Sequence, residues 1–305
     1  MNSVTNSTLV FYARSRLQMG GLREEAETLQ ARLSTGERLS RSSDNPVAAS
    51  RLRTLQRAEQ LGNVDAANAR RAGEDLQVTA GSLESVANDL VRVRELAVWA
   101  ATETIGETER KAIAAEIDDL RLRILESANA LDSSGHAVFG GEGSGKAYET
   151  DAAGTATYIG TATSSTIDLG QGQSVTRGFT GPEVFTFTDG GTATDVFAHL
   201  AAFAAAIRGA ATDPAAAARD AISGLDEALE TVTRVQTVTG ARVAWLDVVQ
   251  DRQVDQSFAR SQTIADTGGV DFASTVAELQ QLLTVLEASQ ASFSRLANLS
   301  LFNQI

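Results

Sequence analysis

Apolar residues recur every three or four positions over most of the chain, which is the spacing of one buried face of an α-helix. The first such row ends before Thr35-Gly36, and its members are Met19, Leu22, Ala26, Leu29 and Leu33. A second helix is predicted to begin at Pro46, because Asp44 and Asn45 suit the capping position and a proline suits the first helical turn. Its row is Leu76, Thr79, Leu83, Val86, Leu90, Val93 and Ala97.

Helical spacing continues in three later segments. One follows the turn at Gly106 and should pack antiparallel to the long helix through Ile113, Ile117, Leu120, Ile124 and Leu131. Another resumes near 195 and, after the cap Asp213-Pro214, runs to Gly268-Gly269. The last has the a/d seam of a coiled coil with one polar member, and it is expected to reach Ile305; the seam is Phe272, Val276, Leu279, Leu283, Leu286, Gln290, Phe293 and Ala297.

The region between about 132 and 191 has a different pattern. It is rich in Gly, Thr and Ser, and its short alternating runs TATYIG, STIDLG and EVFTFTDG predict strands joined by tight turns. We therefore expect a mainly α fold, in which the N- and C-terminal regions form a long antiparallel helical bundle or coiled coil and a small β-rich domain is inserted. The expected domains are a terminal coiled-coil assembly domain (1–42 with 268–305), a helical bundle (43–131 with 195–267) and the variable insert (132–194).

Composition excludes several classes of function. The 305 residues carry a formal net charge of −13, which disfavours nucleic acid as a partner. The chain has no cysteine, and its two histidines, His136 and His199, are far apart, so a metal site is not expected. We interpret His199 as a packing residue and find no carboxylate at ligand spacing from His136. The sequence begins without a secretory signal peptide and has no segment long enough for membrane insertion.

A glycine-rich stretch is the one candidate for catalysis. Gly140 to Lys146 has the G-x-x-x-x-G-K skeleton of a phosphate-binding loop, but Ala147 stands where that loop needs a hydroxyl for magnesium. No helical row follows it, although the helix N-terminus is what holds the phosphate. We interpret the stretch as a surface turn and predict no enzyme activity, no cofactor and no metal. A nucleotide-binding enzyme is a distant alternative.

Four stretches resemble the flagellin-like axial proteins of the bacterial flagellum. LQARLSTGERLSRSSDNPVAASRL (29–52) is similar to that family's N-terminal signature, and AVFGGEGSG (137–145) is similar to the segment that enters its variable region. VTGARVAWLD (238–247) resembles the turn in its returning helix, and the segment from Asp271 to the end resembles its C-terminal helix. Pro46 makes the first stretch more similar to the proteins that join hook and filament than to filament flagellins.

The resemblance implies a structural protein that is exported through the flagellar type III channel and assembles as a ring between hook and filament; filament flagellin is the alternative. Implied partners are other copies of the chain, the first hook-associated protein, flagellin and an export chaperone. Because exposed seams need partners, the terminal helices are expected to pair with each other or with neighbouring copies. The predicted assembly interface comprises Met19, Leu22, Leu29, Leu33, Phe272, Val276, Leu279, Leu283, Leu286, Gln290 and Phe293.

Overall fold

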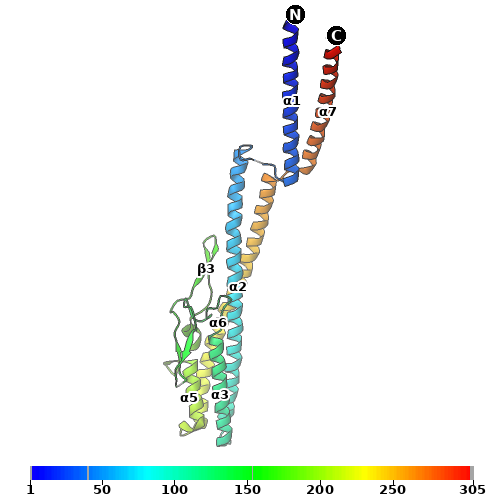
Figure 1. The fold of residues 1–305 in the computed structure, drawn as a ribbon. Helices are drawn as coiled ribbons and strands as arrows, with labels where there is room; N and C mark the ends of the chain where they lie inside the picture. The colour runs from blue at the N-terminus through cyan, green and yellow to red at the C-terminus, as the bar shows by residue number, and fades with distance from the viewer. Residues whose placement is uncertain (1, 40, 153, 303–305) are drawn as a thin grey trace. The chain divides into compact units, whose positions relative to one another are not determined.

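The computed structural model describes residues 2–39, 41–152 and 154–302, so the predicted helical continuation to Ile305 lies outside the described residues. The chain divides into two compact units. The first combines residues 1–60 with 256–305, and the second comprises residues 61–255. The division falls inside two long helices, α2 (Pro46–Ala100) and α6 (Pro214–Gly268), which are labelled in Figure 1. A separate 132–194 domain remains a prediction.

The position of this division has a local cause in the first unit. The beginning of α2 and the end of α6 pair there: the Arg260 guanidinium donates to the Glu59 carboxylate at 2.8 Å, and the Ser257 hydroxyl donates to the same carboxylate at 2.6 Å. The side chain of Leu52 also packs against Gly268. These helix ends therefore belong with the terminal helices and not with the bundle.

The terminal helices α1 (Asn2–Thr35) and α7 (Phe272–Phe302) pack against each other, as expected (Figure 1). The rings of Tyr12 and Phe293 meet edge to face with centroids 5.3 Å apart. Gly36 ends α1 with a φ of 72°, a left-handed conformation that glycine adopts without steric cost.

A short two-stranded contact joins the two connections of the first unit. The Arg38 amide donates to the Gly268 carbonyl at 2.7 Å, and the Val270 amide donates to the Gly36 carbonyl at 3.0 Å. The connection after α1 is thereby tied to the connection before α7.

The predicted helix starts are confirmed by their caps. The Asn45 side chain accepts a hydrogen bond from the Ala48 amide at 3.0 Å, directly before Pro46. Asp213 accepts from the Ala216 amide at 3.0 Å, directly before Pro214. In each case a polar side chain satisfies an amide that the first helical turn leaves without a partner.

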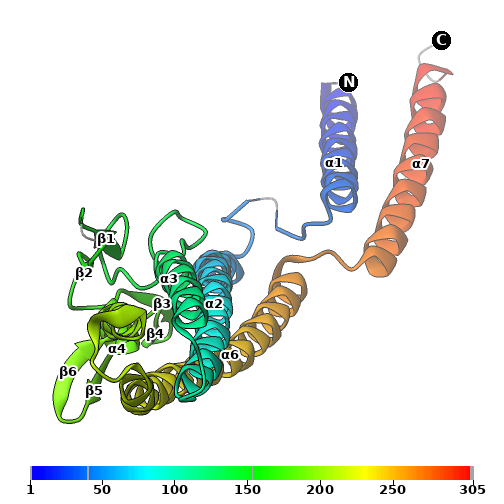
Figure 2. The same cartoon turned by 90° about the horizontal axis from the view of Figure 1, so that it is seen from below.

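The second unit is a helical bundle with β-hairpins on one side (Figure 2). Its core joins α2 to α3 (Glu107–Ala128), α5 (Val196–Ala205) and α6, with a π-helical turn η1 (Ala206–Ala210) after α5. The rows predicted for the α2–α3 pair are buried, with one exception: Leu131 lies beyond the end of α3 and is 52% exposed. A residue after the helix end no longer follows the helical period, so the prediction for Leu131 is wrong.

The β region consists of three antiparallel hairpins: β1 (Tyr148–Thr150) with β2 (Ala156–Tyr158), β3 (Thr166–Gly170) with β4 (Gln173–Thr176), and β5 (Thr186–Asp189) with β6 (Thr192–Asp195). The hairpin β3–β4 covers α2 and α6 through Leu169 and Val175. One prediction is corrected: the EVF run belongs to a short helix, α4 (Gly181–Phe185), because Thr180 and Glu183 form a capping box that starts a helix there.

Candidate functional site

The predicted interface residues of α1 lie on the side that packs. Leu29 is buried, and Met19, Leu22 and Leu33 are half-buried. Ala26, at the same spacing, is also buried. The row read from the sequence is therefore the packed face of α1 in the first unit.

The predicted seam of α7 is divided between two faces. Leu279, Leu286 and Phe293 are half-buried, whereas four other members are exposed: Phe272, Val276, Leu283 and Gln290. The row that packs is spaced 4-3-4-3-4 and consists of Thr275, Leu279, Leu282, Leu286, Ser289 and Phe293. Sequence reasoning missed three of these residues. Adjacent leucines at 282 and 283 fit two alternative seams equally well, so spacing alone could not choose between them.

Exposed apolar side chains remain on both terminal helices. On α1 they include Val10, Phe11 and Leu17, and on α7 they include Phe272, Val276, Leu283 and Val285. A groove of about 670 Å³ lies between the two helices and is lined in part by Phe11 and Val285. Apolar helix faces of this kind are typical of surfaces that become buried on association.

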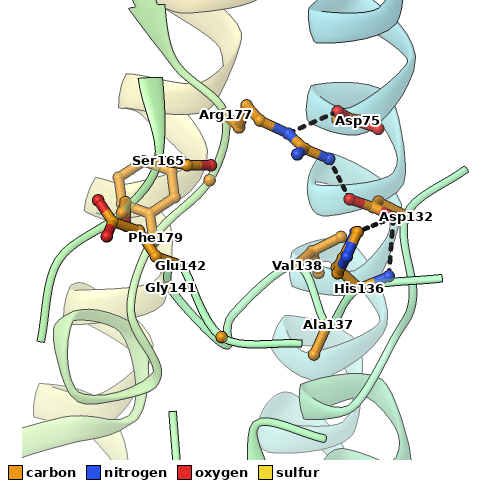
Figure 3. A pocket seen from close by; sticks show the side chains of 13 residues that line it. Asp75, Asp132, His136, Ala137, Val138, Gly141, Glu142, Ser165, Arg177 and Phe179 are labelled. Carbon is orange, nitrogen blue, oxygen red and sulfur yellow. Dashed lines mark hydrogen bonds and ion pairs between the residues drawn. The ribbon is translucent and has the colours of Figure 1, made fainter. Parts of the chain in front are cut away.

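A second candidate site in the bundle unit is a cluster of charged side chains around Arg177 (Figure 3). Arg177 follows β4 and pairs with Asp75 of α2, Nε to Oδ2 at 2.9 Å, and with Asp132 of the loop after α3. Asp132 also accepts a hydrogen bond from the backbone amide of His136 at 2.9 Å, and its carboxylate lies 3.7 Å from the His136 Nδ1. The loop folds back over four residues and brings the Asp132 carboxylate beside His136.

This cluster has the geometry of a structural clamp. Both carboxylates are almost completely buried, and one guanidinium pairs with both. The adjoining cavity measures only about 130 Å³. In the part of the chain that the structure describes, no group of three or more His, Cys, Asp or Glu side chains could hold a metal ion. The cluster therefore joins three segments of the bundle unit: α2, the loop after α3 and the strand end at Arg177.

The glycine-rich stretch has a structural place in the same unit. Phe139 is fully buried and meets Phe185 edge to face at 5.4 Å, while Gly140 pairs with Thr180 across an isolated bridge. The chain after Lys146 enters strand β1, whereas a phosphate-binding loop opens into a helix. The stretch is thus a folded turn that anchors the start of the insert.

The second histidine, His199, has a packing role. His199 is largely buried; its Nε2 lies 3.1 Å from the Ala221 carbonyl and its ring packs on Phe187, as expected for a packing residue. Among the described residues, no helix combines the length and apolarity needed to cross a membrane.

Comparison with known proteins gives matches to bacterial flagellar proteins. The model of the bacterial flagellin N-terminal helical region matches residues 7–144. Flagellar hook-associated protein 3 of Escherichia coli (strain K12) is 26% identical over 312 residues, which cover 97% of this chain and 98% of that protein. Flagellar hook-associated protein 3 of Salmonella typhimurium is 24% identical over 316 residues, with the same coverage.

The fold is shared with solved structures. The crystal structure of the flagellar junction protein FlgL from Legionella pneumophila is 15% identical, has a TM-score of 0.61, and covers 72% of this chain and 100% of its own. FlgL from Xanthomonas campestris is 16% identical with a TM-score of 0.63, and the match covers 69% of this chain and 99% of that one. The chain is thus similar to the bacterial flagellin N-terminal helical region over residues 7–144 and to flagellar hook-associated protein 3 over nearly its whole length, and it shares its fold with solved flagellar junction proteins.

Proposed function

We propose that this chain is a structural subunit of the bacterial flagellum and works at the junction between hook and filament. The observation that carries the proposal is the end-to-end similarity to hook-associated protein 3, which covers 97% of the chain and includes the insert between the helical regions. The N-terminal family match alone is equally compatible with filament flagellin, because it stops at residue 144.

Assembly is proposed to use the exposed faces of α1 and α7. Phe272, Val276 and Leu283 stay exposed after the two helices have packed, so only another chain can bury them. Removing such apolar side chains from water favours association. We propose other copies of this chain as the principal partners, with the first hook-associated protein and flagellin on either side and an export chaperone before assembly.

The proposed role needs no catalysis. The Arg177 cluster serves as a clamp, and the glycine turn leads into a strand. The distant alternative, a nucleotide-binding enzyme, requires saturable ATP binding that is lost in Lys146→Ala. We expect no saturable ATP binding by the unaltered chain or by this variant.

Location in the cell separates the junction role from the flagellin alternative. In a strain that lacks the chromosomal copy, we expect hooks without attached filaments, and attachment should return when the full chain is supplied. Immunogold labelling should then mark the base of each filament only. Label along the whole filament would instead identify the chain as a flagellin, and normal filaments in the deletion strain would exclude both roles.

A further inference from the structure

Helix α6 carries a second regular row of residues on the surface of the bundle unit. The row, here called the α6 outer row, is spaced 4-3-4-3-4, and all its members are exposed: Arg234, Val238, Ala241, Trp245, Val248 and Arg252. This is the spacing of a coiled-coil seam. Trp245 is 37% exposed and Val248 is 55% exposed, which leaves a large apolar area without cover. The row therefore has the pattern of a helix face that packs on another helix.

The ends of the α6 outer row are positively charged. Among the described residues, neither Arg234 nor Arg252 makes an ion pair or a hydrogen bond. The chain as a whole carries a formal net charge of −13, so two uncompensated cations on one apolar face are unusual for this surface. A partner helix that suits the row needs apolar residues at the same spacing and negative charge beside them.

Helix α2 presents a row with these properties. The α2 outer row is spaced 4-3-4-3 and is exposed throughout: Glu84, Asn88, Val91, Glu95 and Val98. Val91 is 46% exposed and Val98 is 51% exposed. Glu84 has no ion-pair partner among the described residues. Glu95 accepts a hydrogen bond from Arg92 at 2.9 Å. This pair lies on the open surface, where an ion pair contributes little to stability, so Glu95 can pair with a cation of another chain instead.

Both rows belong to the same compact unit, residues 61–255, and both stay exposed within it. The fold of one chain therefore does not bring them together. We propose that the α6 outer row of one copy binds the α2 outer row of a neighbouring copy. Because the contact joins two different surfaces, it repeats from copy to copy and produces a ring or a helical array rather than a closed dimer. The inference rests on the proposed function, which requires such an array.

Site-directed cross-linking tests this contact directly, since the chain has no cysteine of its own. Val91→Cys and Ala241→Cys place one thiol near the centre of each row, so the test does not depend on the relative direction of the two helices. A chain that carries both substitutions should give a ladder of cross-linked multimers with a short bismaleimide. Each single variant alone should stay monomeric on a denaturing gel, and a mixture of the two should give dimers only.

Helix α3 provides a matched control. Leu122 is 55% exposed and lies beside the acidic residues Asp119 and Glu126. It therefore tests whether any exposed helix face that carries apolar and acidic residues can bind the α6 outer row. Leu122→Cys combined with Ala241→Cys should give no ladder. Cross-linking through Leu122 in place of Val91, or dimers from either single variant, would overturn the assignment of the α2 outer row.

Charge reversal provides a second, independent measurement. Arg234→Glu with Arg252→Glu should reduce the cross-linked fraction about tenfold, because both rows of the contact then carry negative charge. Adding Glu84→Arg and Glu95→Arg should restore it. The same concentrated samples are also analysed by sedimentation before cross-linking. This measurement detects assembly of the chain whichever surfaces join the copies. Assembly without the Val91–Ala241 ladder would refute this contact and leave the proposed function intact, whereas a chain that stays monomeric would count against both.

Discussion

At the scale of single residues, Arg177 links two buried carboxylates of the bundle unit. Asp75 and Asp132 come from different segments, and both are buried next to its guanidinium. Removing the cation leaves two carboxylates without compensation in a medium that solvates charge poorly. Arg177→Ala is expected to lower the free energy of unfolding by about 3 kcal/mol in a urea titration followed by tryptophan fluorescence.

The exposed cation Arg92 is the control for this substitution. Arg92 also bridges two carboxylates, those of Glu95 and Glu116, but on the open surface, and Arg92→Ala should leave the titration nearly unchanged. Asp75→Asn in the Arg177→Ala background should recover part of the lost stability. An equal effect of the two arginine substitutions would show that burial of the pair is not what matters.

A second residue-scale prediction concerns pH and the first unit. Hydrogen bonds from the Arg260 guanidinium and the Ser257 hydroxyl hold the pKa of Glu59 below its usual value of 4.5. A carboxyl group whose pKa is lowered on folding stabilises the folded state above its unfolded pKa, and this contribution is lost as the pH falls through the folded pKa. Glu59→Gln should therefore cost about 1 kcal/mol at pH 7.

Far-UV circular dichroism during urea unfolding can measure this difference at several pH values. The gap between the unaltered chain and Glu59→Gln should stay constant down to about pH 5 and then narrow as the carboxylate is protonated. A gap that is the same at pH 7 and pH 3 would mean that Glu59 acts through packing and not through its charge.

At the scale of elements, the two faces of α7 should have separable roles. Leu282 and Leu283 are adjacent leucines, but the first packs towards α1 and the second is 44% exposed. Leu282→Ala should weaken the α1–α7 pairing of the isolated chain by about 1–2 kcal/mol, as expected for a half-buried leucine. Leu283→Ala should leave the isolated chain unchanged and detach filaments from hooks in cells. Thermal unfolding and electron microscopy of cells measure the two effects.

Leu286 is expected to differ from Leu283. It lies on the packed row with Leu282, so Leu286→Ala should also destabilise the isolated chain, whereas the sequence pattern alone treated positions 283 and 286 as equivalent. If Leu283→Ala lowers the unfolding temperature while filaments stay attached, the exposed face has no part in assembly.

Leu282 and Leu283 also show which features could not be predicted from the sequence. Helix starts were predictable because Asn45-Pro46 and Asp213-Pro214 act through neighbouring atoms. The buried row of α2 was predictable because only one face of that helix is strongly apolar. In α7 two overlapping rows are apolar, and the choice between them depends on where α1 lies, which no local pattern contains.

At the scale of the whole molecule, the predicted class of mainly helical fold with a small β region is confirmed, but the Arg177 clamp was not foreseen. Its members, Asp75, Asp132 and Arg177, are separated by long stretches of sequence, and each looks like an ordinary surface residue. That these charged residues are buried becomes clear only from the three-dimensional arrangement of the three segments that carry them. The two outer rows of α2 and α6 were missed for a related reason, because the strongly apolar buried rows of the same helices dominate the pattern.

The division of the chain into a continuous unit and a discontinuous one also determines an order of events during synthesis. All residues of the 61–255 unit are synthesised before α7, so this unit can fold without α7. The other unit needs segments from both ends of the chain, and α1 has to wait for α7. A chain truncated after residue 271 and released from the ribosome should therefore resist protease across the bundle while α1 is still cleaved.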